Sequence, residues 1–479
     1  MSPTVAIIGA GFGGLCMAIQ LQRAGVDSYT IFEAGAGVGG TWRDNTYPGA
    51  GCDIPSHLYS FSFEKYSSWT RRYPGQQEIL RYLEMCADKY GLRPKIRLNT
   101  AVTGAAFDEA LGRWRVRTAA GEELFDVVVS AVGQLSRPQL PDIPGMSSFL
   151  GPAFHSARWD HSADLTGRRV AVIGSGSSAA QLIPRVAEAA GHLDVFQRTP
   201  NWVIPKPDAT FGPALRTAFR YVPFLQRGYR EWIHRYVEAT LYPALAGGWS
   251  AEALRRHALD HLRAQVPDPA LRAKLTPSYP IGCKRVVIDS EFYPALTRPD
   301  VDVVTDRITR IVPGGVETAA GLREADVIVY ATGFQTSDPL APVEVTGRGG
   351  RRLAEAWREG AEAYLGIAVP GFPNLFLLYG PNTNLGHNSI IFMIECQVRY
   401  VLGCLAHIAA RGPMEVRPEA MAAWRRNLDR AMADMVWQAG CTSWYKNAAG
   451  RVTNNWPATA TLYRRITRAP RPAAFRFAR

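Results

Sequence analysis

The sequence predicts an α/β protein with two doubly wound parallel sheets, and three observations carry the prediction. First, short β-branched strands run straight into glycine-rich turns and apolar helices at two places, near residues 5 and 169. Second, each of these beginnings has a later strand of similar composition, at 126–133 and at 326–334. Third, the chain has 479 residues, which is too long for one hydrophobic core and suits two or three domains.

The first beginning is residues 5–8, an apolar run typical of a strand buried on both faces. The sequence Gly9-x-Gly11-x-x-Gly14 follows at once and opens a helical pattern. In a Rossmann-like dinucleotide fold, the first glycine permits a tight turn and the second lets the backbone approach a pyrophosphate. The third lets the helix pack closely on the strand. The helix N-terminus then offers free N–H groups and a positive dipole to the phosphates.

The next predicted strand, 28–32, ends in Glu33, 24 residues after Gly9. A carboxylate at this place accepts hydrogen bonds from the ribose hydroxyls. Strand, glycines, helix and terminal acid together are far more specific than the glycines alone. We therefore predict an FAD site here.

The same strand–turn–helix motif occurs a second time. A predicted strand at 169–173 is followed by Gly174-x-Gly176-x-x-Ala179 and a helix. Its next strand, 193–197, ends in a basic residue where the first ends in an acid. An arginine pairs with a 2′-phosphate, so we expect this site to take NADPH in preference to NADH; a surface arginine after a strand is the alternative. The residues assigned to this site are Gly174, Gly176, Ser177, Arg198 and Thr199.

The two beginnings predict an FAD domain that is interrupted by an NADPH domain. Residues 215–245 and 251–266 have helical patterns that break the doubly wound order, and the tail after Arg468 is expected to be disordered. The expected parts are residues 1–144 (FAD domain, first part), 145–325 (NADPH domain, with a helical insertion at about 208–277) and 326–479 (FAD domain, second part, and C-terminal segment).

Charge and composition exclude several classes of partner. The formal net charge is +12, yet only seven of the 54 basic residues are lysines and the arginines are scattered. This pattern favours a solvated arginine-rich surface, so we expect no nucleic-acid partner. The longest apolar stretch, 390–410, is broken by three charged or polar residues and is typical of a buried helix, so we expect no membrane partner. Nothing indicates an obligate protein partner or a metal site.

Seven cysteines are spread along the chain with no C-x-x-C pair. Such a set is typical of reduced thiols in a cytoplasmic protein, and the chain starts directly with a strand, so we expect a cytoplasmic location. A flavin disulfide reductase shares the double nucleotide fold but needs a redox cysteine pair, so the sequence argues against it.

Two longer motifs narrow the function. Residues 39–53 read G-G-T-W-R-D-N-T-Y-P-G-A-G-C-D, and 149–160 contain Phe149-x-Gly151-x3-His155-x3-Trp159-Asp160. They resemble the fingerprints G-G-x-W-x4-[YF]-P-G-x3-D and F-x-G-x3-H-x3-W-[PD] of the type I Baeyer–Villiger monooxygenases, which are class B flavoprotein monooxygenases. Physically, Gly39 and Gly40 can bring backbone against a flat ring. Trp42, next to the cofactor-binding candidate Thr41, offers an aromatic face, and the Pro-Gly turn directs Asp53 back toward the same place.

The resemblance implies a reaction and a set of roles. NADPH reduces FAD, O2 reacts with the reduced flavin, and the resulting C4a-peroxyflavin inserts one oxygen atom beside the carbonyl of an apolar ketone, giving an ester or lactone. Arg285 would stabilise the anionic peroxide and the adduct, and Asp53 would hold that arginine by a bidentate pair. The remaining implied roles are a phosphate contact at Lys284, an NADP contact at Trp444, and a hinge between domains at Gly151, His155 and Trp159.

Two further readings stay open. Oxygenation of a sulfide or an amine by the same peroxyflavin needs a protonated, electrophilic peroxide, for which Arg285 matters less. A flavin-binding protein without catalytic activity is the last alternative, which the complete fingerprints disfavour. The particular ketone does not follow from the sequence.

Overall fold

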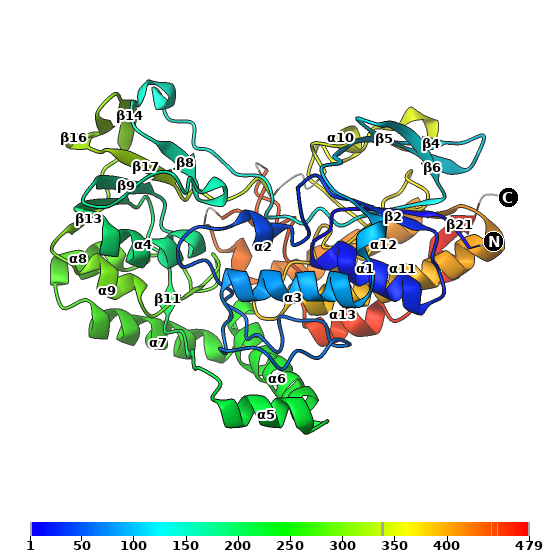
Figure 1. The fold of residues 1–479 in the computed structure, drawn as a ribbon, viewed down its shortest axis with the longest axis horizontal. Helices are drawn as coiled ribbons and strands as arrows, with labels where there is room; N and C mark the ends of the chain where they lie inside the picture. Colours follow the sequence, from blue (N-terminus) through cyan, green and yellow to red (C-terminus); the bar gives the residue numbers. More distant parts are fainter. Residues whose placement is uncertain (1, 337–339, 442, 448, 478–479) are drawn as a thin grey trace.

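The protein is described here from a computed structural model that covers residues 2–336, 340–441, 443–447 and 449–477. Figure 1 shows two α/β lobes side by side, with two helices of the insertion projecting below them. Each lobe contains one parallel five-stranded sheet, so the predicted fold class agrees with the observed architecture.

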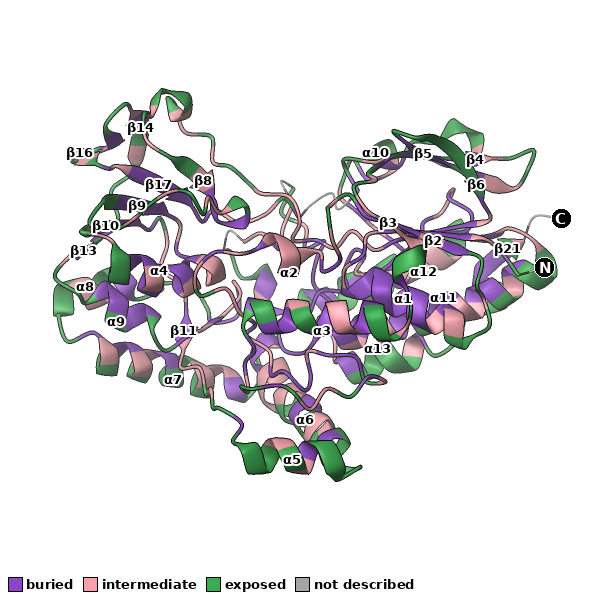
Figure 2. Cartoon of the chain, in the orientation of Figure 1, coloured by how far each residue is buried: buried purple, intermediate pink, exposed green. Residues whose placement is uncertain are grey.

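The first lobe is built on a parallel sheet whose central strand is the first predicted strand. Four of its five strands are apolar and largely buried, because helices or a second sheet cover both faces. These strands are residues 5–8, 29–32, 127–130 and 375–377. Figure 2 shows α1, on one of these faces, buried along most of its length. The sheet order is β19 (Leu375–Leu377), β7 (Val127–Ser130), β1 (Val5–Ile8), β2 (Tyr29–Phe32) and β3 (Ile96–Arg97).

Helices and a smaller sheet complete the first lobe. One face carries α1 and α11, which pack against each other, and the other face meets the small sheet through Trp114, which is fully buried. The elements are α1 (Phe12–Arg23), α2 (Thr41–Asp44), α3 (Gln76–Lys89), α10 (Leu353–Ala356), α11 (Ile390–Arg411), α12 (Pro418–Ala433), α13 (Ala460–Ile466), and the sheet of β18 (Glu344–Thr346), β4 (Val102–Asp108), β5 (Arg113–Thr118) and β6 (Gly121–Phe125).

The second lobe repeats the arrangement on the second glycine turn. Its sheet order is β13 (Val301–Val304), β10 (His192–Phe196), β9 (Arg169–Ile173), β17 (Val327–Tyr330) and β8 (Ala153–His155), with every pair parallel. Further elements are α4 (Ser177–Ala189), α9 (Phe292–Leu296), the antiparallel β14 (Ile308–Val312), β15 (Gly315–Thr318) and β16 (Gly321–Glu324), and the paired β11 (Val203–Ile204) and β12 (Val287–Ile288).

The predicted boundary between residues 325 and 326 is too early. β17 pairs with β9 and β8 of the second sheet, so the chain has not yet returned to the first lobe there. The return to the first sheet is made by β19 at Leu375–Leu377, which pairs with β7. β17 thus stands beside β9 in the same way that β7 stands beside β1.

The helical insertion consists of α5 (Pro213–Tyr221), α6 (Leu225–Leu245), α7 (Ser250–Gln265) and α8 (Pro269–Leu275). The continuous helix expected over 215–245 is divided, because Pro223 lies between α5 and α6 and proline lacks the N–H that a helix interior needs. α5 is largely exposed (Figure 2), whereas α6 and α7 contact each other.

The tail after Arg468 is ordered over the residues that the structure describes. β21 (Phe475–Phe477) pairs antiparallel with β20 (Met414–Val416), and Phe475 is buried, so the prediction of a disordered end is wrong for this strand.

The 3₁₀ helices of the described residues are η1 (Arg93–Lys95), η2 (Met146–Ser148), η3 (Ser156–Arg158), η4 (Arg348–Gly350), η5 (Val436–Gln438) and η6 (Pro472–Ala474).

Two expectations about single features have different outcomes. α11 is long and apolar enough to cross a membrane by length and composition, but more than half of its apolar window is buried against the core, in keeping with the predicted buried helix. The expectation of seven reduced thiols is wrong, since Cys283 and Cys441 form a disulfide. The two cysteines are 158 residues apart in the sequence, so no short cysteine-spacing motif could predict this disulfide.

Candidate active site

Each of the two glycine turns packs against the chain that follows the neighbouring strand of its sheet, and this close approach requires glycine. Gly9 has φ +104°, and a side-chain carbon on it would stand 2.7 Å from the carbonyl oxygen of Ala131, just after β7. Gly174 has φ +123°, and the same carbon would stand 2.3 Å from the carbonyl oxygen of Ala331, just after β17. Only glycine tolerates this conformation and approach. Gly14 has the packing role predicted for it, because a side chain there would collide with the carbonyl oxygen of Gly9.

One cleft joins the two turns. Its volume is 1890 Å³, well beyond the roughly 300–1,000 Å³ of ordinary small-molecule pockets, so there is room for two dinucleotides. The predicted site residues that line it are Gly9, Gly11, Glu33, Gly40, Thr41, Trp42, Asp53, Gly174, Gly176, Ser177, Arg198, Thr199, Lys284, Arg285 and Trp444. Residues of the first lobe, the second lobe and the C-terminal segment therefore meet at a single place.

The FAD half of the cleft has the donor set and the space that such a cofactor requires. Gly11 faces Gly40, and a side-chain carbon on Gly11 would lie 3.7 Å from the Gly40 Cα, leaving a bare backbone surface between the two turns. Glu33 is buried at the end of β2, and its two oxygens accept from the N–H groups of Ala10 and Gly35, each at 2.8 Å. An oxygen of a carboxylate has two lone pairs, so Glu33 keeps accepting capacity for a ribose hydroxyl.

Sequence reasoning missed a partner of Glu33. Arg43, inside the first fingerprint, donates from Nη1 to Glu33 Oε1 at 2.8 Å and from Nε to Asp44 at 2.8 Å. Trp42 contacts Tyr59 edge to face with ring centroids 5.6 Å apart, and its indole N–H donates to the Tyr59 hydroxyl at 3.2 Å. The first fingerprint is therefore held from both sides of its short helix α2.

Arg285 and Asp53 form the ion pair that the resemblance implied, with a different geometry. Both Nη2 and Nε of Arg285 donate to the same oxygen, Oδ2 of Asp53, at 2.6 and 3.1 Å. The pair is thus convergent on one oxygen and is not the expected two-oxygen fork. The Asp53 carboxylate is the main reason that the pKa of Arg285 lies above its ordinary value, so this guanidinium is permanently charged.

Two cations face each other in the NADPH half of the cleft. Burial is the main reason that the pKa of Lys284 lies below its ordinary value. The positive charge of the nearby Arg198 lowers this pKa further. Lys284 Nζ also stands 4.8 Å from the centroid of the Tyr279 ring. Like charges held together in a partly buried wall favour an anion between them, and the 2′-phosphate of NADPH has the required charge.

Phenols and amides complete the wall near Arg285, and sequence reasoning did not single out the phenols. Burial raises the pKa of Tyr445 to about 12, and the positive charge of Arg285 acts in the opposite direction. Tyr379 donates to Asn384 Oδ1 at 2.7 Å, and Asn384 donates to Asn455 Oδ1 at 2.7 Å. Asn384 belongs to the asparagine- and glycine-rich run 382–388 before α11. The composition of this run fits a helix cap and a backbone contact to a flavin equally well.

Trp444 lines the cleft from the C-terminal segment, of which Thr442 lies outside the described residues. Its backbone carbonyl accepts from Thr336 Oγ1 at 3.1 Å and from Asn454 Nδ2 at 2.9 Å. Its ring packs on Tyr445 with centroids 4.6 Å apart.

The second fingerprint lies in the second lobe, where β8 is the edge strand beside β17. Within it, Arg158 lines the cleft, whereas Gly151, His155 and Trp159 do not. Gly151 is close to the carbonyl oxygen of Asp326, where any side chain would collide. His155 ends β8, caps η3 by accepting from the Ala157 N–H at 3.0 Å, and is buried, which lowers its pKa. Trp159 packs edge to face on Phe154 at 5.1 Å. These positions suit a hinge more than direct catalysis.

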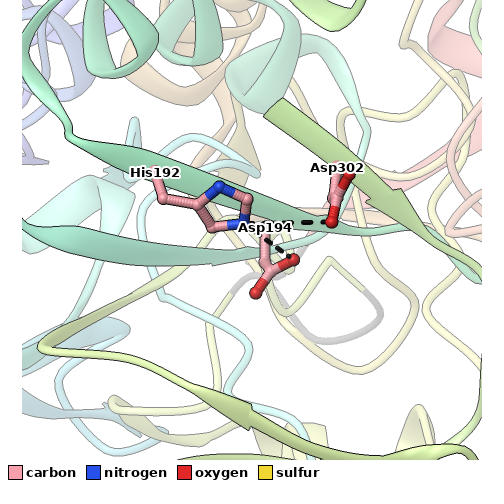
Figure 3. A group of neighbouring side chains, drawn as sticks. All are labelled: His192, Asp194 and Asp302. Carbon is pink, nitrogen blue, oxygen red and sulfur yellow. Dashed lines mark ion pairs between the residues drawn. The ribbon is translucent and has the colours of Figure 1, made fainter. Parts of the chain in front are cut away.

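A second polar cluster lies outside the cleft. His192, Asp194 and Asp302 of β10 and β13 gather in the second lobe, as Figure 3 shows. Arg323 already supplies a positive charge there, with Nη1 at 3.0 Å from Asp302 and 3.4 Å from Asp194. A guanidinium in this place makes the cluster an ion-pair network, so we assign no metal to it.

Two glycine turns, a buried acid and a paired cation around one cleft define an NADP-dependent flavoprotein monooxygenase. Comparison with known proteins agrees. A family model described as pyridine nucleotide-disulphide oxidoreductase matches residues 6–222. A Baeyer-Villiger monooxygenase of Streptomyces coelicolor is 45% identical over 474 residues, covering 97% of this chain and 90% of the relative.

Solved structures give the same answer. An oxidised steroid monooxygenase bound to NADP has a TM-score of 0.86 and 34% identity, covering 98% of this chain and 97% of that one. OTEMO in complex with FAD and NADP has a TM-score of 0.88 and 29% identity, with both chains covered completely. The chain belongs to the Baeyer–Villiger monooxygenases. The predictions of fold class, family, reaction and the cofactors FAD and NADPH are therefore confirmed.

Proposed function

We propose that Arg285 is the residue on which oxygen insertion depends in this chain, that Asp53 positions it, and that the substrate is an apolar ketone. The observation that carries the proposal is the convergent ion pair on the wall of the shared cleft. When bound, FAD supplies the activated oxygen and NADPH supplies the electrons. The fixed positive charge of Arg285 then has two tasks, which are to stabilise negative charge on the attacking oxygen and on the carbonyl oxygen that it attacks.

Asp53 contributes by holding the guanidinium in one orientation. With Nε and Nη2 engaged by a single carboxylate oxygen, the plane of Arg285 is defined before substrate arrives. A charge that is already oriented needs no reorganisation during the reaction. This arrangement favours insertion beside a ketone over oxygenation of a sulfide or an amine, since only the former builds an oxyanion at the substrate.

In this proposal Arg198 and Lys284 bind the 2′-phosphate of NADPH. The turn residues Gly174, Gly176, Ser177 and Thr199 line the same end of the cleft, which supports this role. At the FAD end, Gly9, Gly11, Gly40 and Thr41 leave backbone free for the pyrophosphate and the ring, and Glu33 takes the ribose. Trp444 limits the entry of water, because it lines the cleft on a segment anchored through its own carbonyl. His155, Gly151 and Trp159 serve relative movement of the lobes.

The proposal of an apolar ketone is supported by the composition of the wall. Apolar and aromatic side chains form much of it: Ile54, Tyr59, Leu378, Leu385, Ile391, Ile394 and Trp444. Such a wall desolvates a hydrocarbon substrate and leaves its carbonyl to the single cation.

The test is product analysis with a panel of cyclic, linear and aryl ketones, together with one aryl sulfide. Purified protein with NADPH and O2 is expected to give ester or lactone from apolar ketones, with little hydrogen peroxide. Arg285→Lys is the matched variant, since it keeps the charge and loses the planar fork. Undiminished ester formation by Arg285→Ala would contradict the assigned role, and conversion of the sulfide alone would favour heteroatom oxygenation.

A further inference from the structure

A disulfide joins the loop of the proposed catalytic arginine to the segment that carries Trp444. Cys283 immediately precedes Lys284 and Arg285, and Cys441 stands three residues before Trp444. The bond spans 158 residues of sequence and connects Cα atoms 6.3 Å apart. Both cysteines are buried, Cys283 completely and Cys441 to 8% exposure. The two chain segments that flank the cleft are thus covalently connected at its edge.

The surroundings of the bond show that the two segments also pack directly. A side-chain carbon on Gly282, whose φ is +85°, would stand 2.8 Å from Leu245 and 3.3 Å from Val436. Leu245 ends α6, and it shares one apolar cluster with Trp437 and Tyr445. The loop before Arg285 therefore rests on η5 and on the C-terminal end of α6.

Beyond the bond, the segment is held a second time. The Trp444 carbonyl accepts the hydrogen bonds from Thr336 and Asn454, and Tyr445 lies near the charge of Arg285. Hydrogen bonds of this kind open and close readily at a protein surface, whereas a disulfide does not. Among the described contacts of the two segments, the covalent link is consequently the restraint that does not open and close.

The five other cysteines make a useful contrast. Within the described residues Cys16, Cys52, Cys86, Cys396 and Cys404 are free and buried. Each lies inside the first lobe or beside it, away from a second sulfur at bonding distance. The single pair that does bond is the pair next to the proposed catalytic arginine.

We propose that Cys283 and Cys441 are positioning residues for oxygen insertion, because their disulfide holds the Trp444 segment over Arg285. The inference rests on the proposed roles of Arg285 and Trp444. With the bond intact, the segment keeps water out of the cleft and retains the nicotinamide cofactor. A dithiol reductant breaks the S–S bond by delivering two electrons and two protons, leaving two thiols and a cyclic disulfide of the reductant. The segment then moves further and more often, and O2 takes up the two electrons that NADPH supplies, with two protons, to leave as hydrogen peroxide in place of ester.

The experiment compares the holoenzyme before and after treatment with dithiothreitol. Peptide mapping by mass spectrometry shows whether residues 283 and 441 are linked. Hydrogen exchange of residues 443–447 reports the mobility of the segment without any substrate. Ester and hydrogen peroxide formed per NADPH oxidised report coupling. Reduction is expected to speed exchange about tenfold and to raise the peroxide fraction several-fold, while the rate of NADPH oxidation changes by less than about twofold.

Single variants supply the control. Cys283→Ser and Cys441→Ser are each expected to match the reduced wild type in exchange and coupling, and added dithiothreitol is expected to change neither of them further. Because reduction of the wild type requires no mutation, the test survives a variant that fails to fold. Treatment of the reduced wild type with hydrogen peroxide, which accepts the two electrons and becomes two water molecules, is expected to restore both values.

Three results would overturn the proposal. They are the absence of a 283–441 linkage in untreated protein, an exchange rate that reduction does not alter, or faster exchange with unchanged coupling on a ketone that is converted. If no ketone is converted at all, the proposed function fails, but the exchange of residues 443–447 still decides whether the disulfide restrains the segment.

Discussion

Arg285 donates from both Nε and Nη2 to a single oxygen of Asp53, at 3.1 and 2.6 Å, across 232 residues of sequence. The pair therefore leaves Nη1 outside the carboxylate contact, and the guanidinium is oriented by one oxygen only. This arrangement makes the contribution of charge separable from the contribution of orientation.

Removing the charge is expected to abolish insertion and to spare cofactor binding. Arg285→Ala should lower ester formation from a ketone by at least about a hundredfold, the scale on which loss of one preorganised oxyanion donor acts. FAD content should stay the same, because the turn at Gly9 lies in the other lobe, and the electrons that still flow should appear as hydrogen peroxide. Coupled assays of ester and peroxide measure both. An ester rate equal to that of the wild type would remove Arg285 from the mechanism.

Removing only the orientation is expected to give a milder defect. Asp53→Asn keeps the shape of the side chain and withdraws the negative charge that engages Nε and Nη2 of Arg285. The ester yield per NADPH should fall less than in Arg285→Ala, with the peroxide yield rising to match. A defect as deep as that of the arginine variant would mean that Asp53 acts directly on flavin or substrate.

The preference for NADPH is expected to depend on Arg198. A hydrogen bond to a charged group contributes about 1.5–3 kcal/mol, so Arg198→Ala should reduce discrimination against NADH roughly 10- to 150-fold. Arg255→Ala is the matched control, because Arg255 is an exposed arginine that pairs with Glu252 on the insertion. Michaelis constants for both coenzymes check this prediction. Equal changes in the two constants would show that Arg198 does not contact the phosphate.

Lys284 predicts a pH dependence of NADPH use. Burial, and then the charge of Arg198, lower its pKa in the free protein, so the ammonium loses its proton at a lower pH than an ordinary lysine. Below that pKa the lysine is charged and binds phosphate, and as pH rises through it kcat/KM for NADPH should fall. Lys284→Arg should move this decline to higher pH, because arginine stays charged. The profile for NADH, which has no 2′-phosphate, should lack this decline in both proteins.

The two glycine turns allow the cofactor assignments to be separated. A methyl group on Gly11 meets the protein only at an ordinary contact distance of 3.7 Å, and the one on Gly176 has no described atom within 4 Å. Both alanine variants should therefore fold. Gly11→Ala should purify largely colourless, whereas Gly176→Ala should purify yellow and bind NADPH weakly. Absorbance at the flavin bands and coenzyme titration measure these outcomes, and full FAD occupancy in Gly11→Ala would refute the first site.

Sequence reasoning predicted best where the information is local. The turns at Gly9 and Gly174 can each be recognised from a few consecutive residues, and in the structure both turns line one cleft. It failed at β17, because the run at 326–334 matches 126–133 so closely that composition cannot say which sheet receives it. The partner of a strand is set by residues that are distant in the sequence, so the pattern of the strand itself does not identify that partner.

Cys283 and Cys441 illustrate the same limit for side chains. No spacing rule connects sulfurs 158 residues apart, and the expectation of free thiols came from the absence of local pairs. The geometry at Asp53 was likewise beyond the motif. A fingerprint can name two residues as partners, but which oxygen accepts depends on the backbone of both lobes.

The carbonyl oxygens of Ala131 and Ala331 press on Gly9 and Gly174, whereas α5 to α8 leave the second sheet between β10 and β13, on the other side of β9. The contact at the Gly174 turn and the helical insertion thus lie on opposite sides of β9 in the second lobe's strand order. The end of α6 nevertheless reaches the cluster of Trp444 through Leu245. Lengthening, shortening or exchanging this insertion is therefore expected to act on the cleft through the packing of the Trp444 segment, and to leave the two coenzyme-binding turns unchanged.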